Sequence, residues 1–158
     1  MGRIEVSIPE GKYDNQDAVE KVISYILRLD NPQLVGGYGI VPTSLSDIIN
    51  QFIRVKQYYG KTDGKQIFHI VFSVERTLCF KTLQVKEIGR MLAAYWGMER
   101  QVVFAVHDDT RNIHIHMGIN TVSFLNGSYK GFYDLDEIKK YANHCVDKIT
   151  DKVWFGKS

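Results

Sequence analysis

The stretch that decides the fold is HDDTRNIHIHMGIN, which runs from His107 to Asn120 and holds three of the five histidines of the chain. Its second half alternates apolar and polar residues, as in a β-strand whose successive side chains point to opposite faces. His114 and His116 therefore emerge side by side on one face. His107 ends the preceding apolar run, residues 102–106, and a short turn brings it back beside the pair. The pattern predicts an antiparallel hairpin on which three imidazoles converge.

Three converging imidazoles favour a metal site, although any one of these histidines alone would be an ordinary core or surface residue. Three protein ligands leave coordination positions open for water or substrate, whereas structural zinc sites usually close with four. An open site indicates catalysis. By ligand softness, imidazoles favour manganese, cobalt, nickel or zinc over magnesium.

Outward from the hairpin, the sequence alternates predicted helices and strands without repeats or linkers. Periodicity and capping signals predict helices that end near Asp30, run over about 44–59 and 82–96, and begin again at Asp134. Strands are expected over 66–75, 100–107 and 112–123. Strands joined by hairpins imply an antiparallel sheet packed by helices, so the predicted class is α/β of the α+β type.

Composition adds broad limits. The 158 residues, 44% hydrophobic and 24% charged, suffice for one domain over 1–158 with a full core. A net charge of +2 does not by itself indicate nucleic-acid binding, and the cluster Lys56, Lys61 and Lys65 is expected to be a solvated face. No apolar run is long enough to span a bilayer and no apolar signal segment is present, which predicts a cytoplasmic protein without membrane insertion.

The histidine pattern resembles the signature of relaxases, the mobilisation nucleases of plasmids and conjugative elements within the HUH endonuclease superfamily. The similar residues are His107, Asp108 to Thr110, His114-Ile115-His116 and Asn120. The likeness extends to a tyrosine-bearing helix near the start, a strand over 68–73 and a long helix before the hairpin. The resemblance implies an HUH-like sandwich of two or three layers and a DNA-cleaving tyrosine.

Relaxases place that tyrosine near the N-terminus, upstream of the histidines, which favours Tyr25. At about 100° per residue, Tyr25 lies roughly 130° from the centre of the apolar stripe of its helix, at the polar flank. Its hydroxyl could therefore reach a cleft. Lys21 and Arg28, its i−4 and i+3 neighbours, are placed to hold DNA phosphates or to lower the pKa of the hydroxyl.

Other tyrosines compete for this role. Tyr141 is the main rival, because replication initiators and some transposases of the superfamily carry the nucleophile on a helix after the histidines. It falls inside an apolar stripe, however, and burial makes a poor nucleophile. Tyr58 and Tyr59 are expected to pack or to stack on bases. Tyr13 and Tyr38 lie in loop-like stretches and stay open.

Further residues are candidates for support of the site. Asp109 could orient an imidazole through its other nitrogen, or could be a solvent-facing turn residue. Glu75 shares a strand face with His69 and could act as a base or a hydrogen-bond acceptor near the metal. Asn120 lies on the face of the two strand histidines and could contact DNA or fix the site. His69 itself is expected to be structural.

Together with these features, the resemblance implies site- and strand-specific nicking of single-stranded DNA at an origin of transfer. A divalent ion on the three histidines, magnesium or manganese by the family resemblance, would bind a non-bridging oxygen of the scissile phosphate while the tyrosine attacks in line. The 5'-phosphotyrosyl product needs no ATP and can be resealed. The family further implies accessory origin-binding and coupling proteins as partners.

Three alternatives remain open from the sequence. The same histidines could activate water in a metal-dependent nuclease or phosphoesterase without a covalent intermediate. The chain could be an initiator-type or transposase-type HUH protein. It could also be a DNA-binding module without catalysis. Whether Tyr25 faces the histidines separates the first alternative from the relaxase mechanism.

Overall fold

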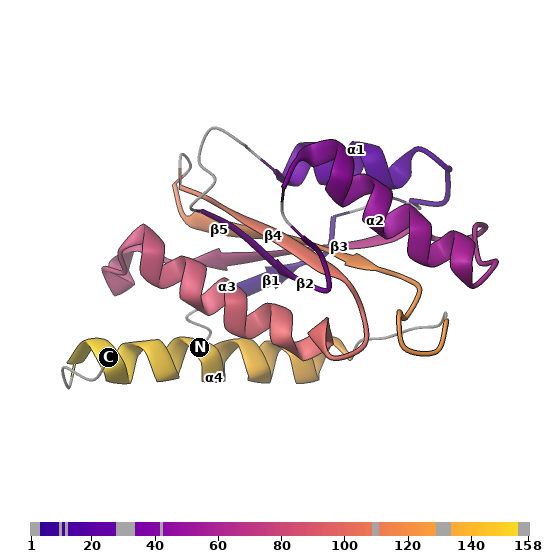
Figure 1. Ribbon diagram of the computed structural model, residues 1–158. Coiled ribbons are helices and arrows are strands. Elements are labelled where there is room, and N and C mark those ends of the chain that lie inside the picture. The colour runs from indigo at the N-terminus through magenta and orange to yellow at the C-terminus, as the bar shows by residue number, and fades with distance from the viewer. Residues whose placement is uncertain are drawn as a thin grey trace.

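The computed structural model describes residues 4–9, 11, 13–27, 34–41, 43–108, 111–128 and 134–154 (Figure 1). In chain order its elements are β1 (Ile4–Ser7), α1 (Ala18–Ile26), β2 (Val35–Tyr38), α2 (Leu45–Tyr58), β3 (Ile67–Val74), the 3-10 helix η2 (Arg76–Leu78), α3 (Thr82–Gly97), β4 (Val102–His107), β5 (Ile113–Asn120) and α4 (Leu135–Trp154).

The five strands form one antiparallel sheet in the order β1-β3-β5-β4-β2. The predicted hairpin is confirmed, because β4 pairs with β5 in a register that sets His107 opposite His114. Strand β5 also pairs with β3, with Val71 opposite His116. The strand that carries two histidines is therefore the middle strand of the sheet.

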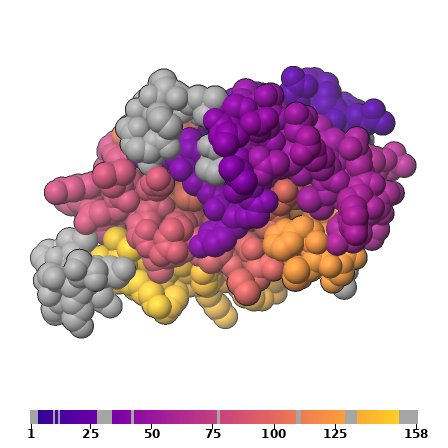
Figure 2. All heavy atoms as spheres, in the orientation of Figure 1, coloured from indigo at the N-terminus to yellow at the C-terminus, as the bar shows by residue number. Residues whose placement is uncertain are grey.

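Helices cover both faces of this sheet, which confirms the α+β prediction and gives three layers. Figure 1 shows α1 and α2 on one side and α3 and α4 on the other; Figure 2 shows α2 and α4 at the surface on opposite sides of the same view. The alternation of β5 sorts its side chains between these layers. Its isoleucines and Met117 belong to the core beneath α3 and α4. Its histidines consequently face the α1 and α2 layer.

A second core joins α1 and α2 to the sheet. Its buried members are Val19, Val22, Ile23, Ile26, Leu27, Ile48, Phe52, Ile67, Val103 and Ala105. Burial of these apolar side chains holds the two helices on the histidine face. The caps also follow the sequence, because Ser44 accepts a hydrogen bond from the N–H of Asp47 and Asp134 accepts from the N–H groups of Asp136 and Glu137.

Two features differ from the sequence-based expectation. The edge strands β1 and β2 were not predicted; each has only four residues, and β2 contains two glycines, so neither carries a clear alternation. Helix α1 ends at Ile26 rather than near Asp30, because Leu27 turns to an extended conformation and buries its side chain in the second core. No helix in the described part of the chain is both long and apolar enough to cross a membrane.

Candidate functional site

Four histidines gather on the sheet face beneath α1. The ring centroid of His116 lies 4.3 Å from that of His107, 6.0 Å from His114 and 5.6 Å from His69. His69, His107 and His116 are buried, whereas His114 is half-buried. The structure thus brings together the three histidines singled out in the sequence and adds a fourth.

His107 ties this cluster to the end of α1. Its Nε2 lies 2.8 Å from the backbone oxygen of Ile26. A carbonyl oxygen only accepts, so Nε2 must be the protonated nitrogen, and in the neutral ring Nδ1 then carries the lone pair. The hydrogen bond fixes the position of the last turn of α1 relative to strand β4.

Tyr25 lies in that last turn, above the histidines. Its ring is 5.5 Å from the ring of His116 and 6.0 Å from that of His69, edge-on to both. The side chain is nevertheless 60% exposed, so a bound molecule has access to it. The exposure agrees with the predicted position of Tyr25 at the polar flank of its helix, and its role as the nucleophile stays a prediction.

A glycine lets the helix approach so closely. Gly118 follows His116 by two positions on the same face of β5. A Cβ atom there would lie 3.0 Å from Cδ1 of Ile67 and 3.2 Å from Cδ1 of Ile26, which is tighter than ordinary packing. The absence of a side chain at Gly118 therefore allows Ile26, and with it Tyr25, to settle against the sheet.

Two further residues lie at the site: His69, which was expected to be structural, and Tyr13, which had stayed open as a candidate nucleophile. Nε2 of His69 lies 3.3 Å from Nδ1 of His116, and the ring of Tyr13 is 6.3 Å from that of His69. Burial, with a smaller contribution from His107, lowers the pKa of His69 to about 4. Burial and the proximity of Tyr25 raise the pKa of Tyr13. Tyr13 is therefore a weaker candidate nucleophile, although it lies close by.

The proposed supporting residues have different surroundings. Lys21 is exposed and forms an ion pair of 2.9 Å with Asp17. Its expected role as a contact to DNA phosphates stays a prediction. Glu75 is half-buried just after β3 and is the N-cap of η2. Arg28 and Asp109 lie outside the described residues, so their roles stay predictions.

Asn120 holds the end of β5 instead of reaching the surface. Its side chain is fully buried. Its Oδ1 accepts from Nζ of Lys56 at 2.8 Å, and its Nδ2 donates to Oε1 of Gln101 at 2.8 Å and to the carbonyl of Phe52 at 3.1 Å. In this structure Asn120 cannot contact DNA, which leaves its other suggested role of fixing the site.

Lys56 corrects the expectation of a solvated lysine cluster. Only 2% of its surface is exposed, because its place on α2 turns it toward the sheet, where Nζ also donates to Oγ1 of Thr121 at 3.0 Å. Burial, with a smaller contribution from the positive charge of Arg100, lowers the pKa of Lys56 to about 7. Lys61 is exposed and Lys65 half-buried.

This buried lysine should make stability depend on pH. The ordinary lysine pKa is 10.5, so above about pH 7 the unfolded chain keeps a proton that the folded chain has released. The free energy of unfolding should then rise between pH 7 and about pH 8.5, by at most about 1.4 kcal/mol per pH unit. Urea unfolding across this range measures the slope. Lys56→Met should remove it, because no proton is then released at this position.

Between pH 7 and about pH 8.5 the pH dependence of stability comes from Lys56 rather than from the other buried groups with shifted pKa values. The lowered pKa of His69 acts below it, and the raised pKa of Cys145, about 11 instead of 9.0, acts above it. The matched control is Lys139→Met, since Lys139 is exposed on α4 and should leave the slope as in the wild type. A slope that survives Lys56→Met would contradict the assignment.

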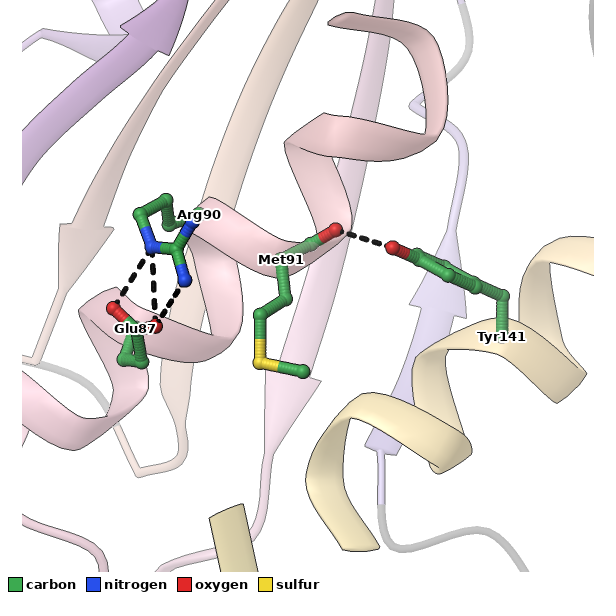
Figure 3. A network of polar contacts seen from close by, with 4 residues as sticks. All are labelled: Glu87, Arg90, Met91 and Tyr141. Carbon is green, nitrogen blue, oxygen red and sulfur yellow. Dashed lines mark hydrogen bonds and ion pairs between the residues drawn. The ribbon is translucent and has the colours of Figure 1, made fainter. Parts of the chain in front are cut away.

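Tyr141, the rival nucleophile, belongs to the other side of the sheet. It packs against the core beneath α3 and α4, and Figure 3 shows its hydroxyl directed at α3, where it donates to the carbonyl oxygen of Met91 at 2.6 Å. Arg90, in the same view, pairs with Glu87 on the surface of α3. Burial raises the pKa of Tyr141 to about 12. The side chain is half-buried rather than fully buried, and Tyr141 lies across the sheet from the histidines.

Sequence comparison agrees with this geometry. Residues 25–150 match the family described as "Relaxase: MobA/VirD2-like, nuclease domain". This chain belongs to that relaxase family. It is also 28% identical over 104 residues to a Staphylococcus aureus protein named "Protein rlx". The aligned part covers 66% of this chain and 29% of that relative, so the chain matches under a third of that relative's length.

Relaxase nuclease domains of this family generally use a divalent metal ion. As the side chains of the described residues lie, no three histidine, cysteine, aspartate or glutamate groups could hold one ion. The donor chemistry nevertheless fits, because imidazole suits divalent transition metals. A metal–imidazole bond is about 2 Å long, and the rings of His107 and His114 lie 4.3 and 6.0 Å from that of His116. The assignment of these three histidines as the ligands stays a prediction.

Proposed function

We propose that this relaxase domain nicks one strand of DNA by transfer of a phosphodiester to Tyr25. The observation that carries the proposal is the position of an exposed tyrosine at 5.5 Å, ring to ring, from a buried histidine of the cluster. A hydroxyl on a fixed helix end beside such a cluster can meet a phosphate held against the same imidazoles.

The proposed step exchanges one ester for another. The Tyr25 oxygen attacks phosphorus and loses its proton, while the bond to the 3' oxygen breaks and that oxygen takes up a proton. One strand then ends in a 3' hydroxyl and the other is joined through its 5' phosphate to the protein. Because a phosphodiester replaces a phosphodiester, the step needs no ATP and its reversal reseals the strand.

His107, His114 and His116 would hold a divalent ion, which when bound supplies positive charge to a phosphate oxygen. The protein supplies the rest. The bond from His107 to the carbonyl of Ile26 holds the helix end that carries Tyr25. His69 contacts His116 at 3.3 Å and fixes the orientation of that ring. Donation of a ring N–H to a backbone carbonyl, as from His107 to Ile26, is an arrangement by which ligating histidines are commonly oriented.

The substrate and partners are part of the proposal. Single-stranded DNA at an origin of transfer is the substrate that the relaxase family implies. Accessory origin-binding and coupling proteins are the further partners that the relaxase family implies. Mobilisation of a plasmid or conjugative element is the biological role that follows.

The activity can be tested with a labelled single-stranded DNA library and manganese, analysed on a denaturing gel. We expect cleaved DNA together with a protein-linked species, both lost when a chelator removes the metal. Cleavage without a protein-linked species would contradict the proposal and would favour hydrolysis by activated water.

A further inference from the structure

A cavity of about 360 Å³ opens between α2 and the chain on either side of it. It is lined by Gln16, Ile53, Lys56, Gln57, Thr62 and Gln66. The volume lies within the range of pockets that bind small organic groups, about 300 to 1,000 Å³. Three of the six lining residues end in a carboxamide, which both donates and accepts hydrogen bonds. None of these residues has a part in the proposed cleavage step.

Gln66 gives this cavity a fixed hydrogen-bond acceptor. The residue is 4% exposed, and its Nε2 donates to the carbonyls of Thr62 at 2.8 Å and Gly64 at 2.9 Å. The amide cannot turn without losing both bonds. Every buried side-chain nitrogen or oxygen among the described residues has a partner, and none of them donates to Oε1 of Gln66. Oε1 is therefore the amide atom of Gln66 that can accept a hydrogen bond from a ligand.

The lining fits a nucleobase better than a phosphate. Lys56 is the only cation in it, and its ammonium group already donates to Asn120 and Thr121. Carboxamides are the side chains that pair with the donor and acceptor edge of a base. Ile53 adds an apolar surface for a ring. A group with a flat apolar face and a polar edge is the chemistry that this set accommodates.

The cavity adjoins the histidine site. The backbone N–H of Gln66 donates to the carbonyl of Tyr13 at 2.7 Å, and the ring of Tyr13 is 6.3 Å from that of His69. Nζ of Lys65 lies 5.3 Å from the Tyr13 ring. Tyr13 thus connects the cavity lining to the histidines, with the positive charge of Lys65 beside its ring. A strand held at the histidines can place a neighbouring nucleotide at the cavity.

We propose that this cavity binds one base of the single-stranded DNA and discriminates between bases through Gln16, Gln57 and Gln66. The proposal rests on the proposed function, since it concerns the substrate of the same site. It makes these glutamines specificity residues that act beside the cleavage chemistry and leave the reacting atoms untouched.

The test uses binding without cleavage. A randomised single-stranded DNA library is selected in chelator with the wild type and with a Gln16→Ala, Gln57→Ala double variant, whose two positions are exposed and so should not affect folding. The wild type should show one position with a strong base preference. The double variant should lose the preference there, keep the others, and bind the selected oligonucleotide about tenfold more weakly. Asn50→Ala is the matched control, because Asn50 is exposed on the same helix and outside the lining.

A second pair of measurements guards the conclusion. An oligonucleotide that lacks the base at the preferred position should bind the wild type about tenfold more weakly, and the double variant no more weakly than the complete oligonucleotide. Gln66→Leu, if its melting curve shows that it folds, should give the same loss of preference. Unchanged preference in the double variant would overturn the proposal. So would a loss that is uniform across sequences with a shallower salt dependence, which indicates a phosphate contact.

These outcomes are independent of the cleavage test. Binding in chelator reports on the cavity even if no protein-linked DNA ever forms. Conversely, a covalent product whose sequence preference is indifferent to the glutamines would leave the proposed function intact and reject the cavity.

Discussion

Tyr25→Phe should abolish the protein-linked DNA while leaving the fold and metal binding unchanged. The substitution removes only the hydroxyl of a side chain that is 60% exposed, so the free energy of unfolding should change by no more than about 0.5 kcal/mol. The attacking oxygen is lost altogether, and we expect at least about a thousandfold less product. Denaturing gels of the DNA reaction and a melting curve of each protein measure both effects.

The matched control is Tyr58→Phe, because Tyr58 is 82% exposed on α2 and contacts no histidine of the cluster among the contacts of the described residues. It should retain activity. Tyr13→Phe and Tyr141→Phe extend the series to the neighbouring tyrosine and to the half-buried rival on the other face of the sheet. If Tyr25→Phe still forms the product and Tyr13→Phe does not, the nucleophile is Tyr13 and the assignment is wrong.

Removal of a histidine ligand should have the second large effect. Wild-type protein at a manganese concentration about 100 times its dissociation constant should gain about 2.7 kcal/mol of stability. His116→Ala should lose this gain and bind manganese at least about 100-fold more weakly, since even residues that only orient a metal ligand cost 10-fold to 100-fold when mutated. Calorimetric titration and melting with and without manganese measure the change without any need for DNA cleavage.

Two further variants separate ligation from folding. His116 is buried and its loss could also weaken packing, so the half-buried His114 supplies a milder substitution, His114→Ala, with the same expected loss. His144→Ala is the control, because His144 is an exposed histidine on α4, the helix on the other face of the sheet. Manganese binding that persists in both His114→Ala and His116→Ala would contradict the ligand set.

The centre of the fold could be predicted from the sequence because alternation acts over neighbouring residues. Strand β5 is apolar on one face and carries His114 and His116 on the other, and only one hairpin register sets His107 beside them. The edge strands carry no such signal. Residues 35–38 pair with β4 over four positions, and their two glycines leave little pattern for a prediction.

The functional site was predictable where a pattern or a family signature marked it, and not where the tertiary structure decides. Tyr25 is marked by its flank position. His69 was separable from its apolar neighbours by phase, but its contact with His116 depends on the pairing of β3 with β5. The burial of Lys56 depends on a partner, Asn120, 64 positions away, and no local periodicity contains that information.

The central claim is that Tyr25 becomes joined to DNA, and mass spectrometry of the protein-linked product tests it most directly. After nuclease trimming and trypsin digestion, cleavage after Lys21 and Arg28 releases residues 22–28, which contain one tyrosine, whereas Tyr13 falls in residues 13–21. The account predicts a nucleotide mass on the tyrosine of 22–28. A nucleotide on 13–21, or on the peptide that contains Tyr141, would contradict it.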